Sequence, residues 1–201
     1  MPPIHVPVLL AIIALLTLGC GDDGRSSGGS GGPSNPNGAA CSLEDDPDCP
    51  LDCAFEQQWP AEWLDAAEEV VELINQLRAA GATCGDTQMP PAGPLRIDPA
   101  LMAASRCHSL DMGEHGELTH TGSDGSSFSQ RAIDAGYEGS PRAENAAAGY
   151  GTPEATVNGW ATSPGHCRNM MAGDSNDVGI GLSVVDGGPY ATWWTAKFGR
   201  R

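Results

Sequence analysis

The sequence has few basic residues. Its 201 residues hold 10 lysines and arginines against 26 aspartates and glutamates, which gives a formal net charge of −16. An acidic surface repels a phosphate backbone, so we expect no nucleic acid among the partners of this protein. The apolar run at residues 6–16 is shorter than a membrane-spanning helix requires.

That apolar run has the length of a signal-peptide core. Residues 1–19 contain no Asp, Glu, Lys or Arg, and they end in Leu-Thr-Leu-Gly before Cys20. This pattern resembles the lipobox of bacterial lipoproteins, in which cleavage precedes a cysteine that is then lipidated. We therefore predict an exported protein with a signal peptide at 1–19 and a lipid anchor at Cys20, which would hold it on a membrane surface of the cell envelope. A plain secretory signal, and hence a secreted protein, is the alternative.

The remaining cysteines also indicate export. Beyond Cys20 the chain has an even set of six, which are Cys41, Cys49, Cys53, Cys84, Cys107 and Cys167. An even set behind an export signal is typical of a disulfide framework, with 15 possible connectivities. No Cys-x-x-Cys pair occurs, and structural zinc sites prefer such close pairs, so three disulfides are favoured over zinc.

Composition divides the rest of the chain into three segments. Residues 20–40 are rich in Gly, Ser, Asn and Pro, which predicts a flexible tether. Residues 41–65 form an acidic, cysteine-bearing lead-in. Residues 66–201 are predicted to fold as one domain, which we expect to be monomeric.

Helical signals come first within this domain. Val70, Val71, Ile74 and Leu77 fall on one face of a helix that Gly81 is placed to end. Three further helices are predicted, at a start marked by Asp98-Pro99, at residues 128–135, and from Thr152-Pro153 to the Ser163-Pro-Gly turn. Residues 83–94, rich in Gly and Pro, are expected to form a loop.

Strand signals follow at the C-terminal end. Side chains alternate in character at residues 178–184 and again at 190–198, and Asp-Gly-Gly-Pro at 186–189 forms a turn between them. This pattern predicts an antiparallel hairpin. Trp193 and Trp194 are neighbours in a strand and so face opposite sides, one in the core and the other exposed or covered by a helix. Helices followed by a hairpin indicate the α+β class.

Five short stretches occur in an order that is specific in combination. They are Leu73–Arg78, Leu118–Gly122, Ala143–Ala146, Trp160–Met171, and Val178–Gly181 before the last strand. Together they resemble the bacterial extracellular branch of the CAP superfamily, whose members carry a cysteine-rich secretory protein or SCP-like domain. The resemblance covers about two thirds of the chain. It implies an α-β-α sandwich that ends in the antiparallel hairpin.

The resemblance also implies a cleft lined by two histidines and two acidic residues. The first histidine matches His120, in Thr-His-Thr-Gly, and the second matches His166, in Ser-Pro-Gly-His. The first acid matches Glu144, in Glu-Asn-Ala. The second acid has no counterpart, because the corresponding region offers Asn158 and Ser163.

Two chemistries are open to such a cleft. Two imidazoles can hold a divalent metal such as zinc, and a Glu–His pair can act as a general base. The alternative is that His120 and His166 only hold loops in place. His115 and His120 are five residues apart, not the four of His-Glu-x-x-His, which disfavours that metalloprotease class. Ser163 lacks a Gly-x-Ser-x-Gly elbow and fits a turn, and His108 is expected to be a packed or surface histidine.

Among disulfides, the resemblance implies the pair Cys84–Cys167, which would tie the end of the first helix to the loop carrying His166. Cys107 would then pair with Cys41, Cys49 or Cys53, leaving the other two together.

Two functions are therefore weighed. We favour a binding module in the cell envelope that requires no cofactor and takes a lipid, glycan or protein ligand, because no nucleophile is recognisable and the second acid is missing. The other is a metal-assisted, peptidase-like hydrolase that uses His120, Glu144 and His166 with zinc.

Overall fold

The computed structural model describes residues 59–201. The predicted signal peptide, the lipid anchor at Cys20, the tether and most of the lead-in lie outside the described residues.

In chain order the elements are α1 (Ala61–Ala80), β1 (Ala82–Cys84), β2 (Thr87–Met89), β3 (Arg96–Ile97), α2 (Pro99–His115), α3 (Phe128–Asp134), β4 (Ser140–Ala148), α4 (Pro153–Thr162), α5 (Pro164–Met171), β5 (Asp177–Val184) and β6 (Thr192–Arg200). The α+β class is confirmed. No helix of residues 59–201 has both the length and the apolar character to cross a membrane.

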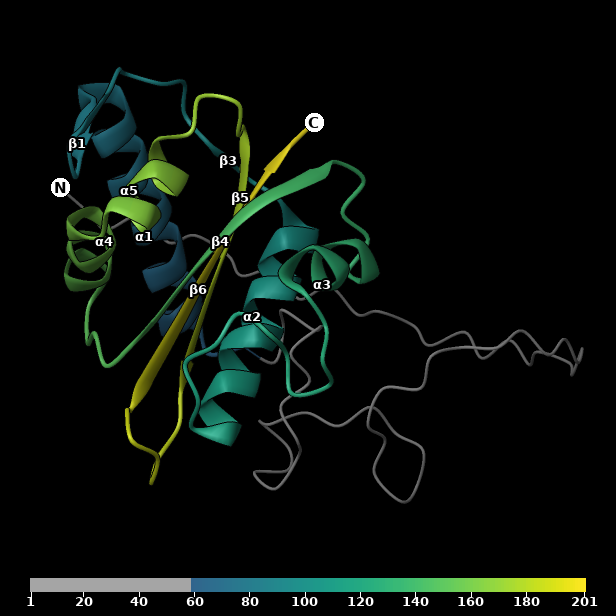
Figure 1. The fold of residues 1–201 in the computed structure, drawn as a ribbon. Coiled ribbons are helices and arrows are strands. Elements are labelled where there is room, and N and C mark those ends of the chain that lie inside the picture. The colour runs from purple at the N-terminus through teal and green to yellow at the C-terminus, as the bar shows by residue number, and fades with distance from the viewer. Residues whose placement is uncertain (1–58) are drawn as a thin grey trace, which may run out of the picture. The chain divides into compact units, whose positions relative to one another are not determined.

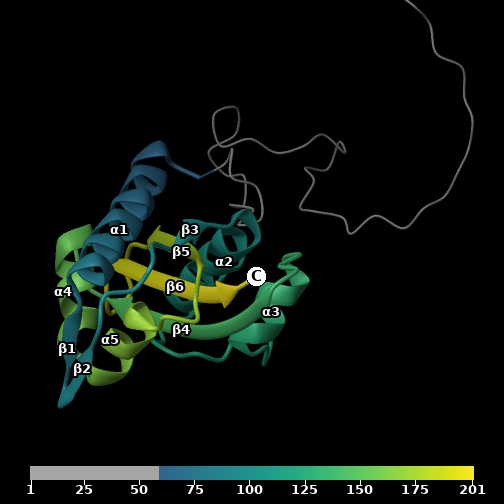
Figure 2. The same cartoon turned by 90° about the horizontal axis from the view of Figure 1, so that it is seen from above.

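A four-stranded sheet in the order β3-β5-β6-β4 forms the middle layer. β3 pairs with β5 in parallel, and the other two pairings are antiparallel. The predicted C-terminal hairpin is β5 and β6, although β6 begins at Thr192, two residues after the predicted start. Helices α1, α4 and α5 lie on one side of the sheet and α2 and α3 on the other, so the layers are α-β-α (Figures 1 and 2).

The side of the sheet toward α1 is hydrophobic, and we call it the apolar face. It is formed by alternate buried residues of the hairpin: Val178, Ile180, Leu182, Trp194, Ala196 and Phe198. From α1, Val70 and Ile74 pack against it, and Trp160 of α4 is buried in the same cluster. Burial of large apolar side chains contributes roughly 1.5–3 kcal/mol each, so this layer is a large source of stability.

The opposite side carries small and polar residues, and we call it the α2 face. Added Cβ atoms at Gly179 and Gly181 would lie 2.1 and 2.3 Å from backbone atoms of α2, so the helix rests directly on the strand. Ser105 and Ser109 of α2 donate hydrogen bonds to the carbonyls of these two glycines. Trp193, the second of the paired tryptophans, is buried here beside Gly113 of α2.

Helix starts behave as the sequence indicates. Asp98 accepts hydrogen bonds from the backbone N–H groups of Ala100 and Leu101, and Thr152 accepts one from Ala155. Gly81, with φ of 75°, ends α1 as predicted. α1 itself begins at Ala61, within the segment taken from the sequence as the lead-in.

Five elements were not predicted: β1, β2, β3, β4 and α5. Residues 83–89, read as part of a loop, belong to the short hairpin β1–β2, and Arg96–Ile97 forms β3. β4 was missed because Pro141 and a run of alanines have low strand propensity, and its pairing with β6 makes it a strand. α5 was missed because Ser163-Pro-Gly reads as a turn, although Ser at the N-cap and Pro at the first position also mark a helix start.

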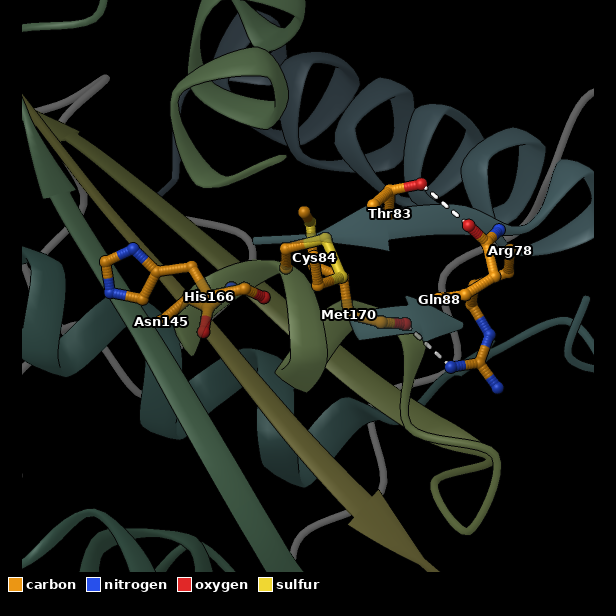
Figure 3. The surroundings of a disulfide bond; sticks show 8 residues. Arg78, Thr83, Cys84, Gln88, Asn145, His166 and Met170 are labelled. Atoms are coloured by element: carbon orange, nitrogen blue, oxygen red, sulfur yellow. Dashed lines mark hydrogen bonds between the residues drawn. A yellow bond between two sulfur atoms is a disulfide. The ribbon is translucent and has the colours of Figure 1, made fainter. Parts of the chain in front are cut away.

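The predicted disulfide between Cys84 and Cys167 is confirmed, and it joins β1 to α5 (Figure 3). A second attachment lies nearby, where the buried Arg78 of α1 donates to the carbonyls of Met170, Ala172 and Ser175. Together these contacts fix the middle and the C-terminal end of α5. Cys107 is also disulfide-bonded, and the predicted choice among Cys41, Cys49 and Cys53 concerns residues outside the described part of the chain.

Candidate functional site

Glu144 lies at the centre of a group of charged side chains on the α2 face. Strand pairing sets it directly opposite Lys197, and both side chains are 1% exposed. Lys197 Nζ donates to Glu144 Oε2, and Arg131 of α3 donates to the same oxygen at 3.0 Å. A buried carboxylate requires such partners, because an unpaired charge in the interior is costly.

Lys197 is the only lysine in the sequence, and it is used in this buried pair. Burial lowers the pKa of Lys197 to about 8, while the charge of Glu144 acts in the opposite direction. Burial alone would raise the pKa of Glu144, but the hydrogen bond from His120 and the charge of Lys197 outweigh it and hold this pKa at about 2. Glu144 is therefore a carboxylate at neutral pH.

His120 lies outside the buried group, in the loop after α2. Its Nδ1 is 2.9 Å from Glu144 Oε1, and its side chain is 57% exposed. Because the carboxylate only accepts, Nδ1 carries the hydrogen and Nε2 keeps its lone pair. Arg131 also donates to the His120 carbonyl, so two contacts hold this residue. The result is an oriented, largely exposed imidazole whose Nε2 can accept a hydrogen bond or bind a metal ion.

His166 comes from the opposite side of the sheet, on α5. Asn145, the neighbour of Glu144 on β4, donates to the His166 carbonyl, and Asn169 donates to Asn145. The His166 ring is directed away from the disulfide, across β4 (Figure 3). Burial, and then the charge of His120, lower the pKa of His166. The structure thus brings His120, Glu144 and His166 to the same edge strand.

Ser163 and Asn158 do not join this group by any hydrogen bond among residues 59–201. Ser163 lies at the junction of α4 and α5, and its hydroxyl does not cap the first turn of α5. Asn158 is exposed on α4. Within the described range, no three His, Cys, Asp or Glu side chains are grouped as a metal site.

Three members of the site were missed by sequence reasoning: His108, Arg131 and Lys197. His108 lies fully buried on α2, with its Nε2 3.6 Å from Glu144 Oε1. The sequence predicted a packed or surface histidine, but it did not predict that His108 lies next to Glu144. A signal for Lys197 existed, because a charged residue between buried positions of a strand requires a buried partner. Arg131 carried no such signal, because it lies on a short polar helix.

Comparisons with known proteins agree with this fold. Residues 71–198 match the profile of the CAP family, described as the cysteine-rich secretory protein family. The uncharacterized protein YkwD of Bacillus subtilis strain 168 is 30% identical over 131 residues, which cover 65% of this chain and 46% of that protein.

Solved structures resemble the fold at lower identity. An extracellular protein with an SCP domain from Bacillus anthracis has a TM-score of 0.58 at 19% identity, covering 85% of this chain and 45% of that one. An outer surface protein of Borrelia burgdorferi has a TM-score of 0.49 at 21% identity, covering 67% of this chain and 88% of that one. This chain spans less than half the length of YkwD and of the Bacillus anthracis protein.

Proposed function

The chain belongs to the CAP, or cysteine-rich secretory protein, family, and from this premise we propose that it is an exported binding module of the cell envelope. In this proposal Cys20 is its lipid anchor, and the His120–Glu144–His166 group forms a binding cleft for a lipid, glycan or protein ligand. The observation that carries it is the Glu144 carboxylate, which is fully engaged in holding Lys197, Arg131 and His120.

A buried carboxylate that is paired with two cations and a histidine is suited to orienting its neighbours and is poorly suited to proton transfer. A pKa of about 2 leaves Glu144 unable to take or give a proton near neutral pH. What it supplies is a fixed His120 ring, whose Nε2 accepts a hydrogen bond from a ligand group. His166, whose pKa is lowered chiefly by burial, is a second imidazole attached to the same strand through Asn145.

The binding role is tested by retention on sedimented bacterial envelope material. We expect His120→Ala and His166→Ala, each in the mature chain carrying Cys20→Ser so that no lipid anchor retains it, to lower retention by about tenfold, the loss of one good hydrogen bond. His115→Ala is the matched control, because His115 is an exposed histidine of α2 whose ring contacts Asp111. Turnover of an envelope polymer by the wild type, lost in both variants, would contradict the proposal. Mass spectrometry of the membrane fraction tests lipidation of Cys20.

Metal-assisted hydrolysis is the second candidate, favoured by one contact. A carboxylate that binds Nδ1 of a histidine is the usual outer partner of a metal ligand, and Glu144 binds His120 in this way. His120 and His166 would hold zinc, with ligand or water in the remaining positions. Bound zinc would supply Lewis-acid activation of a scissile carbonyl.

Calorimetry with zinc separates the candidates. Zinc binding that is lost in His120→Ala and in His166→Ala, but kept in His115→Ala, supports the metal candidate. Equal zinc affinity in all three variants and the wild type would eliminate it.

A further inference from the structure

The loop that carries His120 has no regular structure of its own. Residues 117–127 follow α2 and form neither helix nor strand. Within the loop, the backbone N–H of Thr121 donates to the hydroxyl of Thr119, a bond that spans two residues and does not reach the sheet or a helix. The position of the His120 ring therefore depends on contacts between the loop and the elements around it.

Two consecutive carbonyls of this loop are held by side chains of two helices. Nε2 of His108, on α2, lies 2.9 Å from the Thr119 carbonyl. A carbonyl only accepts, so Nε2 carries the hydrogen and donates it. Arg131, on α3, donates to the next carbonyl, that of His120, at 3.0 Å. These carbonyls belong to the two peptide groups that flank the His120 Cα, so the backbone is fixed on both sides of the residue.

The same two donors lie beside Glu144, which orients the His120 ring. His108 Nε2 is 3.6 Å from Glu144 Oε1, and Arg131 donates to both carboxylate oxygens, at 3.3 and 3.0 Å. Glu144 Oε1 is also the atom that lies 2.9 Å from His120 Nδ1. One group of side chains therefore holds both the backbone and the ring of His120.

His108 acts on the cleft only through other residues. Its side chain is 0% exposed, whereas 11% of the Arg131 side chain is exposed, so the His108 imidazole cannot touch a ligand in the cleft. Burial lowers the pKa of His108 to about 4, so near neutral pH the ring is uncharged and has a single N–H to donate. That hydrogen is directed to the loop.

We propose that His108 is a positioning residue for His120. Its Nε2–H holds the Thr119 carbonyl, and this keeps the His120 Nδ1–H on Glu144. Without that hydrogen the Thr119 carbonyl faces an apolar group, and the loop moves to bring the carbonyl to water, because an unpaired acceptor is unfavourable. The His120 ring then leaves Glu144 and carries its hydrogen on either nitrogen. The proposal rests on the proposed function only for the use to which the fixed ring is put.

The test is imidazole ¹⁵N NMR of the mature chain carrying Cys20→Ser, with the His120 ring in its neutral state. In this chain we expect the hydrogen on Nε2 of His108 and on Nδ1 of His120. In His108→Leu, which fills the space but has no donor, the His120 ring signals should move toward the average of the two tautomers. His108→Gln should restore them, because the amide of Gln donates in place of Nε2.

Ser109→Ala is the matched control for a general loss of stability. Ser109 is the buried neighbour of His108 on α2, and it donates to the Gly181 carbonyl and not to the loop. His120 signals that move as far in Ser109→Ala as in His108→Leu would overturn the proposal, as would signals that stay in place in His108→Leu. A hydrogen on Nδ1 of His108 in the unsubstituted chain would also overturn it, and this measurement needs no variant that must fold.

Envelope retention distinguishes this proposal from the binding role. We expect His108→Leu to lower retention by about tenfold, as His120→Ala does, and His108→Gln to stay within about twofold of the unsubstituted chain. If the His120 signals respond as expected and neither His108→Leu nor His120→Ala changes retention, the positioning role stands and the binding role fails. If His120→Ala loses retention and His108→Leu keeps it, the ring stays in place without His108 and the positioning role fails.

Discussion

The two faces of the sheet are built from the same strands and have opposite character. On the apolar face, Ile180 and Phe198 pack against α1 in a dry cluster. One residue away on the same strands, Gly181 lets α2 approach, and Lys197 pairs with Glu144. Because strand side chains alternate, one strand can serve stability on one side and carry polar groups on the other. The large apolar contacts therefore lie on the apolar face, and the charged and polar contacts lie on the α2 face.

The disulfide lies in the layer on the apolar side, and its loss should be the largest change. Replacing Cys84 and Cys167 together by Ala should lower the free energy of unfolding by about 4–5 kcal/mol, since the bond closes a loop with a sequence separation of 83 residues. Urea denaturation measures this. If the comparison holds, the NMR signals around Glu144 stay in place, whereas their collapse would mean that the two faces are not independent.

Lys197→Met tests the buried pair. It leaves Glu144 buried with one cation fewer and should cost about 4 kcal/mol, measured by urea denaturation at pH 7. Arg200→Met is the matched control, because it removes an exposed cation from the same strand and should cost less than about 0.5 kcal/mol. Equal losses for the two variants would place Lys197 outside the buried group.

Low pH should destabilise the fold through His108, which is buried on the α2 face. The folded-state pKa of His108, about 4, lies below its ordinary value of 6.5, so the unfolded chain takes up the proton first. This contribution to stability is complete above pH 6.5 and is lost as the pH falls toward 4, by about 2–3 kcal/mol between pH 7 and 4.5. Urea midpoints across this range measure it. His108→Gln should remove most of that slope, and an unchanged slope would contradict the buried neutral state of His108.

The close approach of α2 should show the smallest of these effects. An added methyl group at Gly181 meets the Ser105 backbone at 2.3 Å, so Gly181→Ala must displace the helix and should cost about 2 kcal/mol. Gly173→Ala is the control, because nothing lies within 4 Å of its added Cβ. The melting temperatures of both variants measure the difference, and equal values would mean that α2 does not rest on this strand.

The sequence predicted the elements that form the apolar face more completely than the contacts of the α2 face. Periodicity and capping predicted α1, α2 and the hairpin, because local pattern and tertiary packing agree there. β4 escaped because its pairing with β6, and not its own composition, makes it a strand. The family resemblance supplied His120, Glu144 and His166, but Arg131 and His108 join Glu144 through contacts between elements far apart in the chain. Contacts between distant elements produce no pattern in the sequence around either residue, so they could not be predicted from it.

The most direct test of the central claim uses the single lysine. Glu144 is a buried carboxylate held by Lys197, and the one lysine gives one side-chain ¹⁵N signal in a selectively labelled sample. We predict that this signal titrates with a midpoint at about 8, and that the midpoint moves lower in Glu144→Gln because the neighbouring negative charge is lost. A midpoint at the ordinary lysine value of 10.5, the same with and without the Glu144 charge, would contradict it.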